Sequence, residues 1–232
     1  MNHPNIGELL AKIPGSKTAT DAKSRFSHIW KTDEPLLCKG VCFPRTTQDA
    51  STIMQWCHKH QQEVVVHGGL TNLVGGTQTN PDQLVMSLEK MNAIDPVDTQ
   101  NRTIAAQAGA VLENVLDAAQ REQLFLPLSF GARGSAQVGG IISTNAGGLR
   151  VFRYGMTRNW VLGLEVVLPD GTIIKNLKNL RKDNSGIDLK QLFIGAEGIL
   201  GVVTKAVFRL VEQPKTRFLK IEHARFYKSR HG

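Results

Sequence analysis

The sequence lacks a long apolar run. None of its segments reaches the about 18 consecutive apolar residues that mark a membrane-spanning helix. The N-terminus also lacks the basic region followed by an apolar region that is typical of a secretory signal peptide. At 232 residues and 41% hydrophobic content, the chain can nevertheless build a sizeable core. We therefore expect a folded cytoplasmic protein that is not an integral membrane protein.

Aromatic residues are scarce, at 6% of the chain. The formal net charge of +8 could suggest a nucleic-acid partner, but the charge is concentrated at the C-terminal end. In the last eighteen positions one acid, Glu222, stands against six basic residues, which gives five of the eight net charges: Lys215, Arg217, Lys220, Arg225, Lys228 and Arg230. A nucleic-acid groove would be basic across the folded body and interleaved with aromatic rings. The composition thus predicts no nucleic-acid partner.

Cysteine is rare, with three residues: Cys38, Cys42 and Cys57. An odd number fits no complete disulfide set, and a zinc site would need a third and a fourth ligand that the nearby sequence does not offer. Cys38 and Cys42 stand four residues apart in a run typical of a strand, which would place them on one face. We predict small buried thiols in a reducing compartment and no metal site.

Two common nucleotide-binding motifs are missing. No glycine-rich segment continues as Gly-Lys-Ser/Thr, and none reads Gly-x-Gly-x-x-Gly, so the P-loop and the Rossmann fingerprint are both absent. Glycine itself is abundant, with 22 residues, and much of it lies in three segments: His67 to Gly76, Pro127 to Gly148 and Gly195 to Gly201.

Glycines gathered in this way suit a backbone with positive φ or a ligand that approaches the main chain closely. Their N–H groups can form concave nests for a pyrophosphate. Side chains that could add hydrogen bonds are Thr71, Asn72, Ser135, Thr144 and Asn145. In the alternative interpretation the glycines only form tight turns. Three such segments, rich in hydroxyl and amide groups, favour a phosphate-bearing cofactor.

Hydrophobic periodicity predicts alternating helices and strands. Thr46 and Asp49 form a capping-box pattern before a helix whose buried stripe is Ala50, Ile53, Met54 and Cys57. Pro169-Asp170-Gly171 predicts a hairpin turn, because Asp-Gly tolerates positive φ. We expect further helices at 5–13, 21–29, 111–123 and 189–193, and strands at 37–43, 63–66, 83–88, 102–108, 161–168, 172–175 and 202–210.

The three glycine segments, with Arg153-Tyr154-Gly155 and the run from Val161 to Gly171, resemble the FAD-binding domain of the vanillyl-alcohol oxidase and p-cresol methylhydroxylase (PCMH) superfamily. The resemblance is strongest to FAD-linked D-2-hydroxy acid dehydrogenases of the D-lactate, D-2-hydroxyglutarate and glycolate oxidase type. It implies an α+β, PCMH-type fold of two α+β subdomains with FAD bound between them. UDP-N-acetylenolpyruvoylglucosamine reductase has a similar flavin fold, but its glycine segments read differently.

Carried over position by position, the resemblance implies a set of cofactor-binding residues. The pyrophosphate would be wrapped by His67, Gly68, Gly69, Leu70, Thr71 and Asn72. The middle of the cofactor and the flavin ring would be lined by Leu128, Gly131, Ala132, Ser135, Gly139, Thr144, Asn145 and Gly148. The adenine side would meet the backbone of Gly198 and Val202.

Three positions depart from common family residues. His67 and Leu70 can still bind through main-chain atoms, so we expect both to be tolerated. Members with a covalently attached flavin carry histidine where Thr71 stands, so the resemblance implies noncovalent FAD.

The resemblance also divides the chain. It implies an N-terminal helical segment at 1–34, an FAD-binding domain at 35–212 with subdomains 35–95 and 96–212, and a basic tail at 213–232. In the family a substrate-binding cap follows this domain, so we expect a chain truncated at its C-terminus, with the cap missing.

The implied activity is the oxidation of a D-2-hydroxy acid to the 2-oxo acid by hydride transfer to FAD. The small-molecule substrate would bind through the missing cap, and the electron acceptor is unknown. No catalytic base stands out, because His67 is better placed for phosphate than for proton abstraction. The alternative function is a stand-alone FAD-binding subunit of a multi-chain flavoprotein dehydrogenase.

Overall fold

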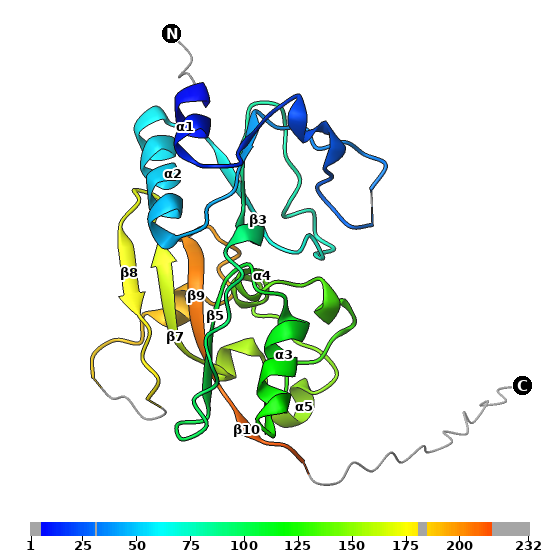
Figure 1. The fold of residues 1–232 in the computed structure, drawn as a ribbon, viewed down its shortest axis with the longest axis vertical. Helices are drawn as coiled ribbons and strands as arrows, with labels where there is room; N and C mark the ends of the chain where they lie inside the picture. The colour runs from blue at the N-terminus through cyan, green and yellow to red at the C-terminus, as the bar shows by residue number, and fades with distance from the viewer. Residues whose placement is uncertain (1–5, 31, 181–184, 215–232) are drawn as a thin grey trace, which may run out of the picture.

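The computed structural model describes residues 6–30, 32–180 and 185–214. They form two four-stranded sheets that lie one above the other in Figure 1 and are called the upper and the lower sheet. Of the basic tail predicted at 213–232, everything beyond Pro214 lies outside the described residues.

The upper sheet has the strand order β1 (Lys17–Thr18), β2 (Gly40–Cys42), β4 (Leu84–Ser87) and β3 (Val64–His67). The strands β2, β4 and β3 are parallel, while β1 pairs antiparallel at the edge. All four residues of β4 are buried, as expected for a central parallel strand covered on both faces. Helices α1 (Ile6–Lys12) and α2 (Thr47–His60) pack on one face.

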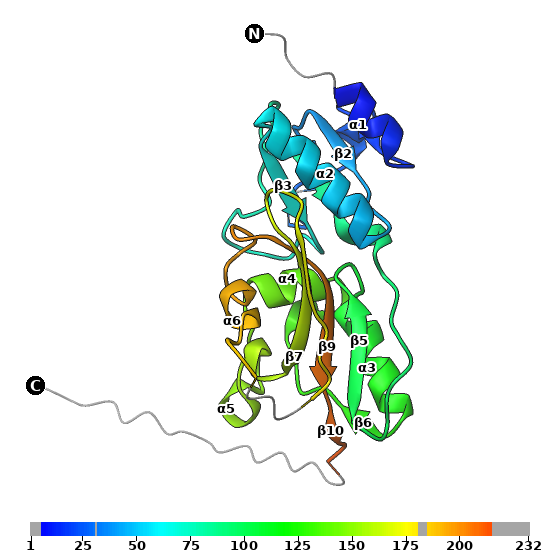
Figure 2. The same ribbon diagram turned by 90° about the vertical axis from the view of Figure 1, so that its left-hand side faces the viewer.

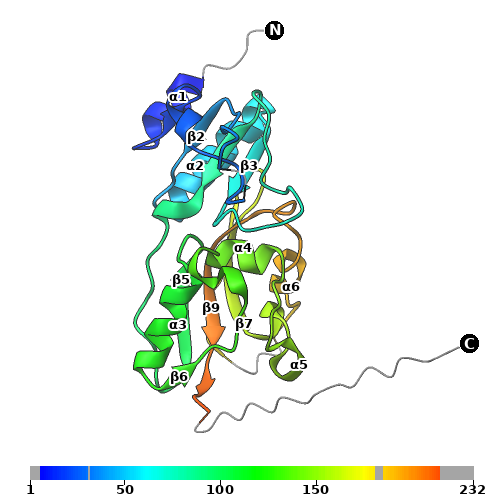
Figure 3. The same cartoon turned by 90° about the vertical axis from the view of Figure 1, so that its right-hand side faces the viewer.

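The lower sheet has the order β5 (Thr103–Gln107), β9 (Val202–Arg209), β7 (Val161–Val167) and β8 (Ile173–Asn176), and all its pairs are antiparallel. Helices α3 (Leu112–Arg121) and α4 (Val138–Ser143) share its hydrophobic core, and they lie over the sheet in Figure 3. The short helices α5 (Val151–Tyr154) and α6 (Lys190–Phe193) lie together at one side in Figure 2. A small ribbon pairs β6 (Leu124–Phe125) with β10 (Val211–Glu212).

Helix α2 connects the two sheets. Thr47 Oγ1 donates a hydrogen bond of 2.5 Å to the buried carboxylate of Glu165 on β7, which also accepts one of 3.0 Å from Thr204 on β9. Ser51 Oγ donates to the carbonyl of Gly171 at 2.6 Å. These buried polar contacts fix the first two turns of α2 against the lower sheet.

Several local predictions are confirmed. The Thr46–Asp49 capping box forms, and Ala50, Ile53, Met54 and Cys57 are all buried on α2. The hairpin between β7 and β8 turns at Pro169-Asp170-Gly171, with Gly171 at φ 86°.

The prediction of a helix at 21–29 is wrong. Only the single 3-10 turn η1 (Asp21–Ser24) forms, followed by extended chain from Arg25. Backbone groups beyond the turn bond to distant segments instead of to the next helical turn: Ile29 N–H donates to the carbonyl of Leu70 at 3.1 Å. Tertiary hydrogen bonds have replaced helical ones.

The strand predicted at 37–43 is shorter, and its two cysteines do not share a face. Cys42 packs with α2, whereas Cys38 packs with Val41 and Val85 on the other side of the sheet. Side chains alternate only where the strand is formed, and β2 begins at Gly40. The predicted burial of all three thiols is confirmed, and it raises the pKa of Cys42 to about 11 and that of Cys57 to about 12.

The segment from Pro127 to Gly148 is not the uninterrupted loop that its glycines predict. It contains the 3-10 turn η3 (Gly131–Gly134) and the helix α4, and none of its six glycines has positive φ. Some permit close packing of the chain. A Cβ on Gly139 would lie 2.9 Å from Ala108 Cβ, and one on Gly148 would lie 2.0 Å from the carbonyl oxygen of Ser129. Turns with positive φ therefore do not explain the glycines of this segment.

Candidate functional site

A cavity of about 680 Å³ lies where the two sheets meet. Val66 of β3 lines it from the upper sheet, and Val202 and Val203 of β9 line it from the lower sheet. The rest of the lining comes mainly from the three glycine segments. The fold thus brings together segments that are more than one hundred residues apart in the sequence.

The first wall of the cavity is residues 67–77, held in shape by polar side chains. Asn72 Oδ1 accepts hydrogen bonds from the N–H groups of Val74 at 3.2 Å and Gly76 at 3.1 Å, and Asn72 Nδ2 donates to Thr77 Oγ1 at 2.9 Å. Leu70 has φ 55°, in the left-handed region. Among the described residues, the N–H groups of Thr71 and Leu73 meet no acceptor. These lining residues therefore keep free donors, as an anion site requires.

His67 supports this wall from behind. Its side chain is 1% exposed, and its Nε2 donates to the carbonyl of Thr77 at 2.9 Å. Burial lowers the pKa of His67 to about 4; the hydrogen bond to Thr77 opposes this shift and the charge of Arg25 adds to it. At neutral pH the imidazole is an uncharged donor that fixes the wall, and it does not line the cavity.

The second wall is residues 131–148, and Gln137 is its most informative side chain. Gln137 stands at the N-cap position of α4 without a side-chain capping bond and lines the cavity, and its Oε1 is buried with no hydrogen-bond partner among the described residues. This oxygen would lie 3.7 Å from a Cβ placed on Gly68, so it sits beside the first wall. A buried acceptor without a donor is costly, which marks a place where a bound molecule can donate.

The third segment packs onto the end of α4. Gly195 N–H donates to the carbonyl of Ile142 at 3.1 Å, and Glu197 N–H donates to that of Ser143 at 2.8 Å. Glu197 has φ 52°, a conformation uncommon for residues other than glycine, and it is the one charged residue in the described lining. Gly198 follows it with φ 85°. The cavity lining thereby includes one acidic residue.

Glycines leave room along the cavity. A Cβ on any of four lining glycines would meet no protein atom within 4 Å: Gly76, Gly131, Gly140 and Gly198. Together with the free N–H groups and the unpartnered Gln137 oxygen, this open backbone fits a large ligand with phosphates and several polar groups.

Most residues predicted to bind the cofactor line the cavity. Twelve do so: Gly68, Gly69, Leu70, Thr71, Asn72, Gly131, Ala132, Gly139, Thr144, Asn145, Gly198 and Val202. The other four do not: His67, Leu128, Ser135 and Gly148. Leu128 is in the core of the lower sheet, and the backbones of Ser135 and Gly148 pack against Gly69 and Ser129.

Sequence reasoning missed Gln137 and Glu197. Gln137 stands between Ala136 and Val138, both buried, so a polar residue in an apolar setting was the available signal. Glu197 stands between Ala196 and Gly198, and nothing in the sequence distinguishes it from an exposed surface acid.

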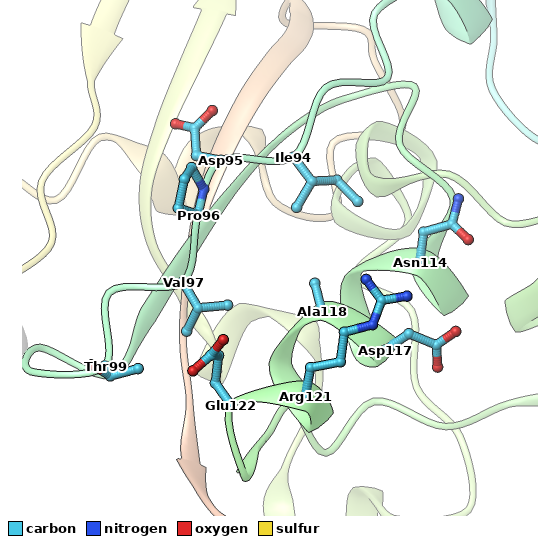
Figure 4. A pocket seen from close by; sticks show the side chains of 10 residues that line it. All are labelled: Ile94, Asp95, Pro96, Val97, Thr99, Asn114, Asp117, Ala118, Arg121 and Glu122. Carbon is cyan, nitrogen blue, oxygen red and sulfur yellow. The ribbon is translucent and has the colours of Figure 1, made fainter.

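A second cavity of about 710 Å³ lies between the 94–99 segment and α3 (Figure 4). Its lining contains none of the glycine segments and carries three acids, Asp95, Asp117 and Glu122, against one base, Arg121. Asp95 is already paired with Lys205 at 2.7 Å. Acidic groups at an open surface repel phosphate, so this cavity does not suit a phosphate-bearing cofactor.

Two of the three glycine segments that line the cavity lie within a match to a known family. A family model described as an FAD binding domain matches residues 38–176. The chain belongs to this family. Its cofactor is FAD, as the family resemblance implied.

Curated relatives of this FAD domain are hydroxy-acid dehydrogenases. A putative mitochondrial D-lactate dehydrogenase from Schizosaccharomyces pombe is 49% identical over 162 residues, which cover 70% of this chain and 31% of the relative. The mitochondrial D-2-hydroxyglutarate dehydrogenase of Bos taurus is 46% identical over 77% of this chain and 33% of its own length. The D-2-hydroxyglutarate dehydrogenase of Stutzerimonas stutzeri is 38% identical over 90% of this chain. The FAD domain spans about a third of the length of the first two relatives.

Solved structures confirm the predicted α+β, PCMH-type fold. An alkyldihydroxyacetonephosphate synthase matches 93% of this chain with a TM-score of 0.78 at 20% identity, and the match covers 42% of that protein. The 6-hydroxy-D-nicotine oxidase of Arthrobacter nicotinovorans matches 86% of this chain with a TM-score of 0.73 at 21% identity, over 43% of its own chain. At such identities these matches establish the fold alone.

The described residues contain neither a candidate membrane-spanning helix nor a candidate metal cluster. No helix there has the length and apolar character to cross a membrane, and no three side chains of His, Cys, Asp or Glu gather as a metal site would require.

Proposed function

We propose that the cavity between the sheets holds FAD noncovalently and that the chain is the cofactor domain of an oxidoreductase that oxidises a D-2-hydroxy acid to the 2-oxo acid. Gln137 Oε1 carries this proposal, because it is a buried acceptor without a partner among the described residues and belongs to a residue that lines the cavity, which also presents free N–H groups and open glycine backbone. The names of the curated relatives support the class of substrate.

Each wall has its part in holding the cofactor. The pyrophosphate would lie along Gly68 to Asn72, where the N–H group of Thr71 is free. The flavin and the ribityl chain would lie along 131–145, with Gln137 accepting from a hydroxyl or ring N–H, and the adenine end would meet the backbone at Gly198 and Val202. Thr71 offers a hydroxyl and no imidazole, so the chain has no histidine for covalent attachment at this position.

FAD, when bound, accepts a hydride from the carbon that bears the substrate hydroxyl. The reaction also needs a base for the hydroxyl proton and a cation for the substrate carboxylate. The described lining has no His, Lys or Arg. We therefore propose that these groups come from polypeptide beyond the described lining, such as a substrate-binding cap.

Exposed apolar side chains support a covering polypeptide. Phe152 on α5 and Leu149 just before this helix are almost fully exposed. Leu73 and Ile199, which follow the lining residues Asn72 and Gly198, are also largely exposed. A cap in the same chain would cover them, and so would a separate subunit, which is the alternative function of a stand-alone FAD-binding subunit. The electron acceptor would contact this cap or this separate subunit.

We also propose the division into subdomain 35–95, which carries the parallel strands of the upper sheet, and subdomain 96–212, which carries the lower sheet. For the compartment we propose a reducing interior, as three unpaired thiols suggest. The cytoplasm is our assignment, although the relatives from Schizosaccharomyces pombe and Bos taurus are named mitochondrial.

Titration of the purified chain with FAD tests the cofactor site. We expect saturable quenching of flavin fluorescence and a flavin that acid precipitation releases, because no covalent bond holds it. Failure to take up added FAD would contradict the proposal. For the reaction, anaerobic D-lactate or D-2-hydroxyglutarate should bleach the flavin of the complete gene product that carries this sequence, while the L enantiomers should not.

A further inference from the structure

The chain before the family match runs along the first wall of the cavity. Three consecutive residues contact this wall. Thr77 Oγ1 donates to the carbonyl of Ser27 at 2.6 Å, and Ile29 N–H donates to the carbonyl of Leu70 at 3.1 Å. Between them, the ring of His28 bonds to the carbonyl of Asn72. We call residues 27–29 the N-terminal clamp.

The bonding of His28 fixes its tautomer. Trp30 N–H donates to His28 Nδ1 at 3.0 Å, so Nδ1 carries no proton. Nε2 therefore carries the proton and donates it to the Asn72 carbonyl. The side chain is 9% exposed and does not line the cavity, so it reaches the site only through the wall.

The clamp is itself anchored to the upper sheet. Arg25 forms an ion pair of 2.6 Å with Glu89, and its guanidinium lies over the ring of Phe43 at 5.1 Å. On either side of this arginine, Ala22 and Leu36 are buried in the same small core. The clamp is therefore held in place by contacts outside the wall, so it can position the wall.

We infer that the N-terminal clamp shapes the FAD site, with His28 as a positioning residue that holds Asn72 and, through it, the backbone of the first wall. This inference rests on the proposed FAD site. Asn72 is the residue whose side chain gathers Val74, Gly76 and Thr77, so a displaced Asn72 would loosen the donors offered to the pyrophosphate. The family match begins at residue 38, so the FAD site extends at least ten residues before it.

Two substitutions at position 28 separate the effect of the hydrogen bond to the Asn72 carbonyl from the effect of having any polar side chain there. In His28→Asn the amide is too short to reach the Asn72 carbonyl but can still accept from Trp30 N–H near the Nδ1 position. In His28→Gln an N–H donor stands near the Nε2 position. Trp30→Ala is the matched control, because its side chain is 68% exposed and only its backbone takes part.

FAD affinity of the full chain is measured for all four proteins, together with amide hydrogen exchange. We expect His28→Asn to weaken FAD binding about tenfold, the size of one lost hydrogen bond to a positioned group. His28→Gln and Trp30→Ala should stay within about twofold of the unaltered chain. In apo protein, His28→Asn should speed exchange in peptides covering 70–77 and leave those of α3 unchanged.

The outcomes are distinguishable. Equal affinity of His28→Asn and the unaltered chain would overturn the clamp and leave the FAD site standing. The same loss in His28→Gln or Trp30→Ala, or faster exchange throughout the chain, would mean general destabilisation and would also overturn it. An unaltered chain that binds no FAD would overturn the proposed function first.

Discussion

The two main walls of the cavity are built in different ways. The first wall, residues 67–77, is shaped by side-chain hydrogen bonds centred on Asn72 and Thr77 and by contacts from the N-terminal clamp. The second wall, residues 131–148, is shaped by a helix and by close packing of glycine backbone. Changes at the close-packed glycines of the second wall should therefore cost folding free energy, whereas changes to the polar contacts around Asn72 in the first wall should cost cofactor affinity.

The strongest way to break this contrast is a pair of glycine variants in the second wall. Gly148→Ala places a Cβ 2.0 Å from the Ser129 carbonyl oxygen, so we expect the free energy of unfolding to fall by about 3 kcal/mol. Gly140→Ala meets no protein atom within 4 Å and favours the helix, so it should keep or gain up to about 1 kcal/mol and yet weaken FAD binding. Denaturant unfolding and FAD titration measure both. Equal stability of the two variants would contradict the packing role.

The pH dependence of stability examines the first wall. The folded pKa of His67 is lowered to about 4 from 6.5, so the unfolded chain binds the proton more readily. Stability is then full above pH 6.5 and is lost as the pH falls towards 4, by about 3 kcal/mol from this group. His67→Gln keeps an N–H donor for Thr77 but does not titrate, so its stability should fall less over this range. Parallel pH profiles of the two proteins would remove His67 as the cause.

Gln137 provides the smallest and most selective test, because it is a side-chain contact within the second wall. Gln137→Leu removes an unpartnered buried oxygen, so the apo protein should keep its stability or gain up to about 1 kcal/mol. FAD binding should weaken about tenfold, since a donor of the cofactor loses its acceptor. Thermal unfolding without FAD measures the change in stability, and the further stabilisation by added FAD measures the change in affinity. Unchanged affinity would show that no bound group donates to Gln137.

Local sequence rules worked where neighbouring residues decide the structure. The Thr46–Asp49 capping box and the Asp170-Gly171 turn formed as predicted, because each depends on contacts within a few residues. They failed at 21–29, where Ile29 bonds to Leu70 instead of continuing a helix. They also failed at α4, since Gly139 and Gly140 are typical of a loop but lie in this helix, where Gly139 packs against Ala108.

By itself the sequence determined the cofactor class and the fold family. Three glycine segments, the first of which contains Thr71, follow local backbone requirements that a phosphate-bearing ligand imposes, and each requirement is met by consecutive residues. Only the tertiary structure decided which groups line the cavity and which support its walls from behind. Burial left Gln137 Oε1 without a partner, made His67 a neutral support and brought His28 onto Asn72, because each depends on atoms supplied by residues far away in the chain.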